Sequence, residues 1–310
     1  MRIVSTVAEM RTACDEARRA GRTVGLVPTM GFFHAGHRSL MLAAREECDF
    51  VVVTVFVNPT QFGPGEDLGA YPRDPDGDAA GARAEGVDLL FTPPVEEMYP
   101  EPGRTTVHVD GLTARLCGAS RPTHFDGVTT VVAKLFAIAG PCRAYFGRKD
   151  AQQLAVVTRM ATDLNLPVAV IGCPLVREAD GVALSSRNAY LGAEERQAAT
   201  ALSRALRQVA AEIVAGERDA AVVRRIAIDT IASVPILTLE YVEVVDAISL
   251  EPRARLAGTV LVALAATVGR TRLIDNATFL FQGGADVIAD LGVTSPGPES
   301  AGPDAGSGDS

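Results

Sequence analysis

In the first half of the chain, short apolar runs alternate with segments in which apolar residues recur every three or four positions. The run at residues 50–57 is almost continuously β-branched, which is typical of a strand buried on both faces of a parallel sheet. The pattern predicts strands at residues 23–27, 50–57, 87–91, 144–146 and 168–171, and helices at residues 37–48, 78–85, 128–139 and 151–164. Strands that alternate with helices form right-handed βαβ units. We therefore predict a Rossmann-like α/β fold with a doubly wound parallel sheet over residues 1–182.

The pattern changes after about residue 183. Two long helical patterns are followed by strand-like runs, at residues 194–215, 220–231, 238–245, 259–265 and 271–274. Helices followed by several strands favour a second, smaller α+β domain with an antiparallel sheet, which we expect over residues 183–284. From residue 285 to residue 310 the chain is rich in Gly, Ser, Pro and Asp, and this segment is predicted to be a disordered tail.

Composition narrows the class of protein. A chain of 310 residues with 47% hydrophobic residues can bury a large core. The net charge of -9 argues against a basic face for nucleic acid, and no run reaches the ~18 apolar residues of a membrane helix. The first ten residues lack the apolar core of a secretory signal. The 5 cysteines are scattered without a CxxC pair, which argues against disulfides or a zinc knuckle. We expect a soluble cytoplasmic enzyme or binding protein without nucleic-acid or membrane partners.

The basic residues are almost all arginine. Of 29 Lys and Arg residues, only Lys134 and Lys149 are lysine. Lysine offers a compact ammonium on a flexible stem, so a lysine in such an arginine-rich chain hints that this geometry matters. Lys134 lies within the predicted helix at residues 128–139, and we interpret it as a surface residue whose stem packs along the helix. Lys149 follows a predicted strand, and we expect it to neutralise phosphate charge.

The segment at residues 28–37 (PTMGFFHAGH) connects the first predicted strand to the first helix. In an open α/β sheet ligands bind at this crossing, where the helix N-terminus presents free N–H groups to phosphate. His34 and His37 are separated by about one helical turn and could point into that site, and Gly31 and Gly36 allow close backbone approach. We favour this over a packing role for the histidines. A zinc site is disfavoured because no Cys or acidic residue lies nearby as a third ligand, and the segment is neither a GxGxxG nor a Walker A motif.

Two further segments carry groups suited to phosphate. Residues 147–153 (GRKDAQQ) follow a strand and open a helix, and they include Lys149 and Asp150. Asp150 could cap that helix or contact the nucleotide or its magnesium, and both roles remain open. In the segment LSSRN, the hydroxyls of Ser185 and Ser186 and the guanidinium of Arg187 can donate several hydrogen bonds to phosphate oxygens. The alternative for this segment is a solvated turn.

Two other positions could bind a small polar substrate. Gln61, in the segment NPTQF, follows the buried strand at residues 50–57 and could hydrogen-bond such a substrate. Arg121, in RPTHF, could hold an anion or form a surface salt bridge, and the two are equally favoured. Residues 63–67 are rich in glycine and acidic side chains, and we expect them to form a mobile loop near Gln61.

The His-x-Gly-His pattern resembles the nucleotidylyltransferase signature shared with class I aminoacyl-tRNA synthetases. The wider set of motifs resembles the pantoate–beta-alanine ligase family, in the family's order: PTMGFFHAGH, FVNPTQF, RPTHFDGV, GRKDAQQL and READGVALSSRNAYL, with a weaker echo at TRLIDN. Each motif is modestly specific, and the ordered set is highly specific. The chain departs from the family at Phe33, where Leu is usual, and at Ala35 and Arg148, where Glu is usual.

The resemblance implies an ATP-dependent ligase that adenylates pantoate and then joins it to beta-alanine, with Mg²⁺ accompanying the nucleotide and a homodimer as the assembly. It implies the catalytic residues His34, His37, Lys149, Ser185, Ser186 and Arg187. ATP is expected to contact these residues together with Met30, Gly31, Gly147, Asp150, Val176 and Leu184. Pantoate and beta-alanine are expected at Pro28, Thr29, Met30, Gln61, Arg121 and Gln153. No set of protein metal ligands is predicted.

Three other functions remain as alternatives. One is a related nucleotidylyltransferase that acts on a different acid or phosphate ester. The second is a nucleotide sensor without activity, which the joint presence of His34, His37, Lys149 and the Ser-Ser-Arg segment disfavours. The third is a zinc hydrolase built on the two histidines, the least favoured of the three.

Overall fold

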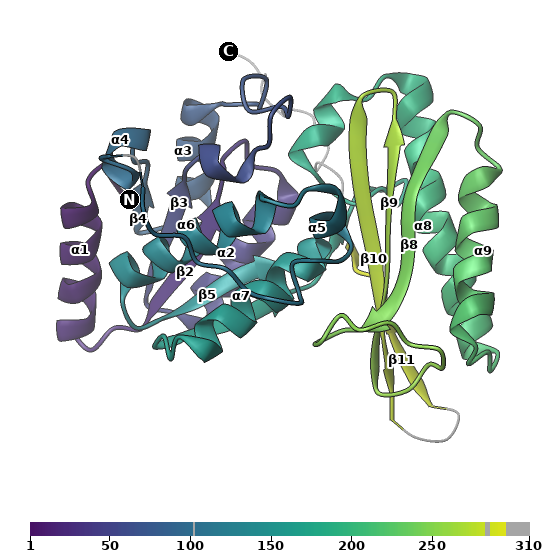
Figure 1. The fold of residues 1–310 in the computed structure, drawn as a ribbon. Coiled ribbons are helices and arrows are strands. Elements are labelled where there is room, and N and C mark those ends of the chain that lie inside the picture. The colour runs from purple at the N-terminus through teal and green to yellow at the C-terminus, as the bar shows by residue number, and fades with distance from the viewer. Residues whose placement is uncertain (102, 283–285, 296–310) are drawn as a thin grey trace, which may run out of the picture.

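The structure is a computed structural model that describes residues 1–101, 103–282 and 286–295, and it contains two main sheets, each covered by helices (Figure 1). The larger sheet has six strands in the order β1-β4-β3-β2-β5-β6. Every neighbouring pair in this sheet is parallel. The strands are β1 Arg2–Val4, β2 Val24–Thr29, β3 Phe50–Val55, β4 Leu89–Phe91, β5 Cys142–Gly147 and β6 Val168–Cys173. This arrangement confirms the predicted doubly wound parallel sheet.

Helices cover both faces of this sheet. One core cluster joins the strands to α1, α6 and α7, and another joins them to α2 and α3 on the opposite face. The helices of this half are α1 Val7–Arg19, α2 Ala35–Glu47, α3 Pro75–Ala84, α4 Val95–Met98, α5 Cys117–Ser120, α6 His124–Ala139 and α7 Ala151–Asp163, with short 3₁₀ helices η1 Pro59–Gln61 and η2 Arg148–Asp150. Because both faces are buried, the strands consist almost entirely of apolar residues.

Three features of this half differ from the sequence predictions. The edge strand β1 and the helix α1 were not predicted, because β1 has only 3 residues and α1 buries only Met10, Ala13, Cys14 and Ala17. The first predicted strand was expected to end at Pro28, but β2 continues to Thr29. Pro28 is tolerated there because the pairing of β2 with β5 involves only Gly25 and Leu26, so Pro28 lies beyond that ladder.

Strand order places a switch point between β2 and β5. In the sheet, β3 and then β4 lie on one side of β2, while β5 and then β6 lie on its other side. After β2 it enters α2 on one face of the sheet, and after β5 it enters α7 on the other face. In open α/β sheets such a reversal opens a crevice at the carboxyl ends of the strands, where ligands bind.

The second half forms a smaller antiparallel sheet with strand order β11-β10-β9-β8. Its helices α8 and α9 lie on the side away from the six-stranded sheet, as Figure 1 shows. The opposite face meets α5 and α7 through a small apolar cluster that includes Leu116 and Leu261. The elements are η3 Ser186–Tyr190, α8 Ala193–Val214, α9 Ala220–Ala232, β8 Leu237–Asp246, β9 Thr259–Val268, β10 Thr271–Phe281 and β11 Val287–Asp290. We propose that the two halves are domains divided near residue 182.

The segment predicted as a disordered tail is partly structured. Strand β11 pairs with β10, and β12 Val293–Thr294 pairs in parallel with β7 Val176–Arg177. The prediction is therefore wrong for these residues, because a neighbouring strand supplies the hydrogen bonds that composition alone did not reveal. Residues 285 and 296–310 of the predicted tail lie outside the described residues.

Close packing of α6 on η1 generates a stability prediction. A Cβ at Gly127 would lie 2.3 Å from the carbonyl oxygen of Thr60 and 2.6 Å from Cα of Gln61. We expect Gly127→Ala to lower the free energy of unfolding by about 1–3 kcal/mol, because backbone must move to make room. Urea denaturation measures the change.

The matched control is Gly81→Ala, also in a helix interior. There the nearest atom to the added Cβ is Cδ2 of Phe33 at 3.6 Å, an ordinary contact. This variant should gain up to ~1 kcal/mol from helix propensity. Equal effects at the two glycines would contradict the close approach of α6 to η1.

Candidate active site

A cavity of about 240 Å³ opens at the carboxyl ends of β2 and β5. It adjoins a larger cavity of about 530 Å³ in the cleft between the two sheets, and several residues, among them Lys149, Gln153 and Arg187, line both. The volume of the larger cavity is typical of small-molecule sites. The position agrees with the switch point of the parallel sheet.

With one exception, the predicted site residues line the smaller cavity. They come from β2 and the following loop, α2, η1, the segment before α6, the end of β5 with η2 and α7, β7, and the segment leading into η3. They are Pro28, Thr29, Met30, His34, His37, Gln61, Arg121, Gly147, Lys149, Asp150, Gln153, Val176, Leu184, Ser185, Ser186 and Arg187. The fold thus gathers residues that lie as far apart as 28 and 187 in the sequence.

The exception is Gly31, which shapes the loop instead of lining the cavity. It adopts φ +83°, and a Cβ there would lie 2.6 Å from Oδ2 of Asp78. The buried Asp78 carboxylate accepts hydrogen bonds from the backbone N–H groups of Phe32 at 2.9 Å and Phe33 at 2.7 Å. Asp78 was not predicted as a site residue, although its place among the small apolar residues of a packed helix is a signal that could have indicated it.

His34 and His37 stack at the start of α2, with ring centroids 4.1 Å apart. His34 is the N-cap residue, and its Nδ1 accepts a hydrogen bond from the N–H of Gly36 at 3.1 Å. Nδ1 of His37 accepts from the N–H of His34 at 3.4 Å. Because Nδ1 is the acceptor in both rings, the proton of each neutral imidazole is assigned to Nε2. Both histidines therefore have an Nε2–H donor to offer a ligand.

Burial controls the charge of these imidazoles. Desolvation, assisted by the positive charge of Lys149, lowers the pKa of His34 to about 4. Burial, the neighbouring His34 and Lys149 lower the pKa of His37 well below its usual value, against the opposing effect of Asp150. In the ligand-free protein both rings are therefore neutral at pH 7.

Lys149 and Asp150 belong to η2, immediately after β5. The Lys149 ammonium lies 3.6 Å from the Asp150 carboxylate, and its side chain is 19% exposed. Asp150 makes no side-chain capping hydrogen bond to α7. Of the two roles considered for Asp150, capping is therefore not observed, and the carboxylate lines both cavities instead.

Arg187 and Arg121 are each held by an acidic side chain of the loop after η1. Arg187 forms two hydrogen bonds of 2.9 Å to the carboxylate of Asp67. Arg121 binds the carboxylate of Glu66 at 2.7 and 2.5 Å with 18% of its side chain exposed, so of its two predicted roles the salt bridge is the one observed, in a partly buried form. The loop expected to be mobile thus contacts both arginines that line the smaller cavity, a role that the sequence did not reveal.

The remaining predicted positions are also placed by local contacts. The Ser185 hydroxyl caps η3 by accepting from the N–H of Arg187 at 3.3 Å, and Ser186 is buried. The Gln61 amide lies 3.1 Å from the sulfur of Met30, and its backbone carbonyl accepts from Nδ1–H of His124 at 2.8 Å. His124 lines both cavities and was not predicted as a site residue.

Arg148, where the family resemblance led us to expect Glu, lines neither cavity. Its guanidinium pairs with Asp290 of β11 at 2.8 Å.

Among the described residues, no group of three His, Cys, Asp or Glu side chains is arranged to hold a metal ion. No helix in the described part of the chain is long and apolar enough to cross a membrane.

Comparisons with known proteins found a family model and several similar proteins. A family model described as pantoate-beta-alanine ligase matches residues 2–278. The pantothenate synthetase of Heliobacterium modesticaldum is 56% identical over 276 residues, which cover 89% of this chain and 98% of that protein. A crystal structure of pantothenate synthetase from Thermus thermophilus has a TM-score of 0.85 at 49% identity, covering 89% of this chain and 98% of that one. Pantoate-beta-alanine ligase from Francisella tularensis, complexed with beta-gamma ATP and beta-alanine, has a TM-score of 0.72 at 30% identity and covers 92% of this chain and 100% of that one.

The buried histidines generate a prediction about pH. Burial lowers the pKa of both His34 and His124 from 6.5 to about 4. Between those values the unfolded chain binds protons that the folded protein does not, so stability is complete above pH 6.5 and falls as the pH drops towards 4. We expect His34→Asn, which keeps a capping side chain, to lose less stability than the parent protein between pH 7 and pH 5. Urea unfolding at both pH values measures this, and an unchanged pH dependence in both His34→Asn and His124→Asn would contradict it.

Proposed function

The chain belongs to the pantoate–beta-alanine ligase family, and on that premise we propose how its residues divide the work of the reaction. It is an ATP-dependent ligase that condenses pantoate with beta-alanine to form pantothenate. The reaction proceeds through pantoyl adenylate and releases pyrophosphate and AMP. The observation that supports the placement of this chemistry is the meeting of His34, His37, Lys149 and the Ser-Ser-Arg segment in one cavity at the switch point of the sheet.

In the first step the pantoate carboxylate attacks the α-phosphorus of ATP, and pyrophosphate leaves. A carboxylate is already ionised at neutral pH, so this step needs no general base. The main barrier is the approach of one anion to another, which donors and cations aimed at the phosphates can lower. Lys149 and Arg187 would supply permanent positive charge. The neutral His34 and His37 would donate Nε2–H hydrogen bonds to phosphoryl oxygens.

The hydroxyls of Ser185 and Ser186 would bind the pyrophosphate oxygens with Arg187 and follow the charge as it leaves. Gln61 and Gln153 line the same cavity and would hold pantoate by its hydroxyls and carboxylate. In the second step the neutral amine of beta-alanine attacks the acyl carbon, and AMP departs. Arg121 lines both cavities, and we propose that it binds a substrate carboxylate.

Glu66 and Asp67 act as internal counterions in this scheme. In the structure, Asp67 pairs with Arg187 and Glu66 pairs with Arg121. Partly buried arginines benefit from such partners, because an unpaired charge removed from water is costly. Substrate anions must therefore displace the two carboxylates, and their loop would move when the site fills.

We propose that Mg²⁺ arrives with ATP and is held mainly by phosphate oxygens and water. This fits the described residues, which contain no cluster of three metal-ligating side chains, and it is the usual mode for magnesium nucleotides. Asp150 is the carboxylate on this part of the cavity wall that could add a contact. The ion would neutralise phosphate charge alongside Lys149.

Two further properties are proposed on the family resemblance: a homodimer and a cytoplasmic location. Sedimentation velocity tests the first, and cell fractionation tests the second. The proposed roles of the individual residues do not depend on either property.

The experiment that tests the function is ATP–pyrophosphate exchange with Mg²⁺ and pantoate, without beta-alanine. Exchange that depends on pantoate is expected, because the adenylate forms reversibly before the amine is needed. If a folded, ATP-binding protein shows no exchange with pantoate, either the acid is wrong or the site is inactive. A screen of other small acids then separates a related nucleotidylyltransferase from a nucleotide sensor without activity.

The same assay tests the catalytic residues. We expect Lys149→Ala and His37→Ala each to reduce turnover by ~10²–10³-fold while the fold survives, as is typical when one preorganised electrostatic contact is lost. Lys134→Ala is the matched control, since Lys134 lies on α6 and lines neither cavity. Circular dichroism checks folding. Near-normal turnover in either site variant would remove that residue from the catalytic set.

The counterion role of Asp67 gives a separate prediction. Asp67→Asn removes the charge that competes for Arg187, so ATP should bind about 1.4- to 5-fold more tightly, in line with the ~0.2–1 kcal/mol of a partly exposed ion pair. Glu66→Gln is the matched control, because Glu66 holds Arg121 and not Arg187. Calorimetric titration with a non-hydrolysable ATP analogue measures both. Weaker ATP binding in Asp67→Asn would show instead that Asp67 supports the nucleotide site.

A further inference from the structure

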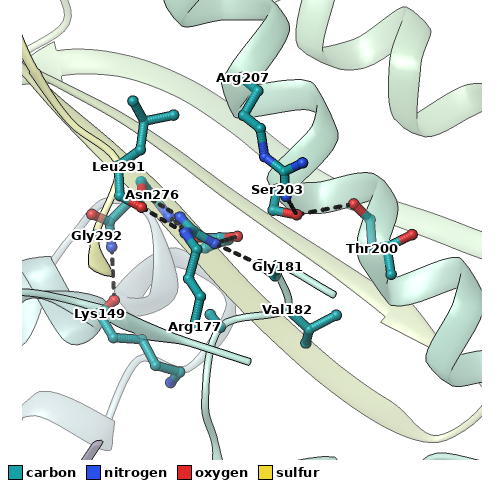
Figure 2. A network of polar contacts seen from close by, with 12 residues as sticks. Lys149, Arg177, Gly181, Val182, Thr200, Ser203, Arg207, Asn276, Leu291 and Gly292 are labelled. Carbon is teal, nitrogen blue, oxygen red and sulfur yellow. Dashed lines mark hydrogen bonds and ion pairs between the residues drawn. The ribbon is translucent and has the colours of Figure 1, made fainter. Parts of the chain in front are cut away.

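The side chain of Asn276 connects the smaller sheet to the backbone of the proposed phosphate-binding lysine. Asn276 lies on β10 and is 6% exposed. Its Nδ2 donates hydrogen bonds to the carbonyl oxygens of Arg148 at 3.0 Å and Lys149 at 2.8 Å. Figure 2 shows this amide next to the Lys149 backbone. One amide group from the second half of the chain therefore holds two consecutive peptide units of η2.

Asn276 is itself held by a buried ion pair. The carboxylate of the preceding residue, Asp275, accepts the N–H of Asn276 at 2.7 Å. Arg177 binds that carboxylate through two hydrogen bonds of 2.7 and 2.9 Å, and the two side chains are only 7% and 2% exposed. Arg177 also donates to the carbonyls of Gly181 at 3.1 Å and Leu291 at 2.5 Å (Figure 2). A buried pair with its remaining donors satisfied has one favoured arrangement, so it fixes β10 opposite η2.

The Lys149 side chain has little of its own to hold it. Within the described residues its ammonium makes one ion pair, to the adjacent Asp150 at 3.6 Å. That distance exceeds a hydrogen bond, and the lysine stem is flexible. Where the ammonium points is therefore set mainly by its backbone, which is the part that Asn276 holds.

We infer that Asn276, supported by Asp275 and Arg177, is a positioning residue for Lys149 in adenylate formation. This inference rests on the proposed role of Lys149 at the phosphates. Asn276 lines the larger cavity but not the smaller one that contains the histidines. It acts through Lys149: two peptide carbonyls anchored by one amide keep the ammonium where the leaving pyrophosphate develops charge. A displacement of about 1 Å in such a group can reduce a rate by ~10²-fold.

The competing explanation is that Asn276 only joins the two halves of the protein. A joining role would affect stability and would reduce activity by the same factor whether or not Lys149 is present. A positioning role would have no effect once the ammonium is gone. A double-mutant cycle separates the two, because residues that act as a unit are not additive.

The experiment measures kcat and the KM values for ATP, pantoate and beta-alanine in the full-length protein, its Asn276→Ala and Lys149→Ala variants, and the double variant. Phe279→Leu is the matched control, since Phe279 is buried on the same strand and lines neither cavity. Thermal unfolding monitors the fold of each variant. If Asn276→Ala does not fold, Asn276→Asp takes its place, because it keeps the shape and replaces the donor amide with a carboxylate.

We expect Asn276→Ala to lower kcat by ~10–100-fold with less than about 2-fold change in KM for pantoate, and to have less than about 2-fold effect in the Lys149→Ala background. Phe279→Leu should lose stability but keep kcat within about 2-fold of the parent. An equal loss of kcat when Asn276→Ala is added to the parent and to Lys149→Ala would overturn this inference but not the proposed role of Lys149. A normal kcat in Asn276→Ala together with a reduced kcat in Lys149→Ala would have the same meaning. Normal turnover in Lys149→Ala would overturn the proposed role of Lys149, and the inference with it.

Discussion

The pairing of β2 with strands on both sides is the constraint on which the site depends. β2 pairs with β3 from Val24 to Thr29, but with β5 only at Gly25 and Leu26, so β2 and β5 separate towards their carboxyl ends. The chain leaves them for opposite faces of the sheet, and the crevice between them is therefore not covered by a crossover helix. His34 and His37 enter it from the start of α2, and Lys149 enters from η2. The position of each group follows from the strand that precedes it.

Cationic side chains that gather in one cavity need partners that keep them in a stable form. The structure meets this need with acidic partners, which are Asp67 for Arg187, Glu66 for Arg121 and Asp150 for Lys149. The histidines remain neutral, because burial lowers the pKa of His34 to about 4. They can therefore donate hydrogen bonds to phosphate without adding further charge to a crowded cavity. Anionic groups of a substrate can therefore replace the acidic partners, because partly exposed ion pairs contribute little free energy.

The smaller sheet also contributes contacts that hold the backbone of η2. Its strand β10 carries Asp275 and Asn276, which contact Arg177 and the backbone of η2. Its helices pack on the other face of the sheet and contribute mainly to the core of that half. The face opposite α8 and α9 meets α5 and α7 and lines the larger cavity, which places this antiparallel sheet beside the proposed site on the parallel sheet.

The sequence by itself determined the fold class, the order of most helices and strands, and the segments that line the cavities. It could do so because apolar periodicity and strand-end motifs are local, as in the run at residues 50–57 and the His-x-Gly-His segment. Only the tertiary structure decided which partner each charged group has. Asn276 and Lys149 are 127 positions apart, and Arg187 and Asp67 are 120 apart, so no local pattern links them. The strands β11 and β12 escaped prediction for the same reason, since each is stabilised by a partner strand and not by its own composition.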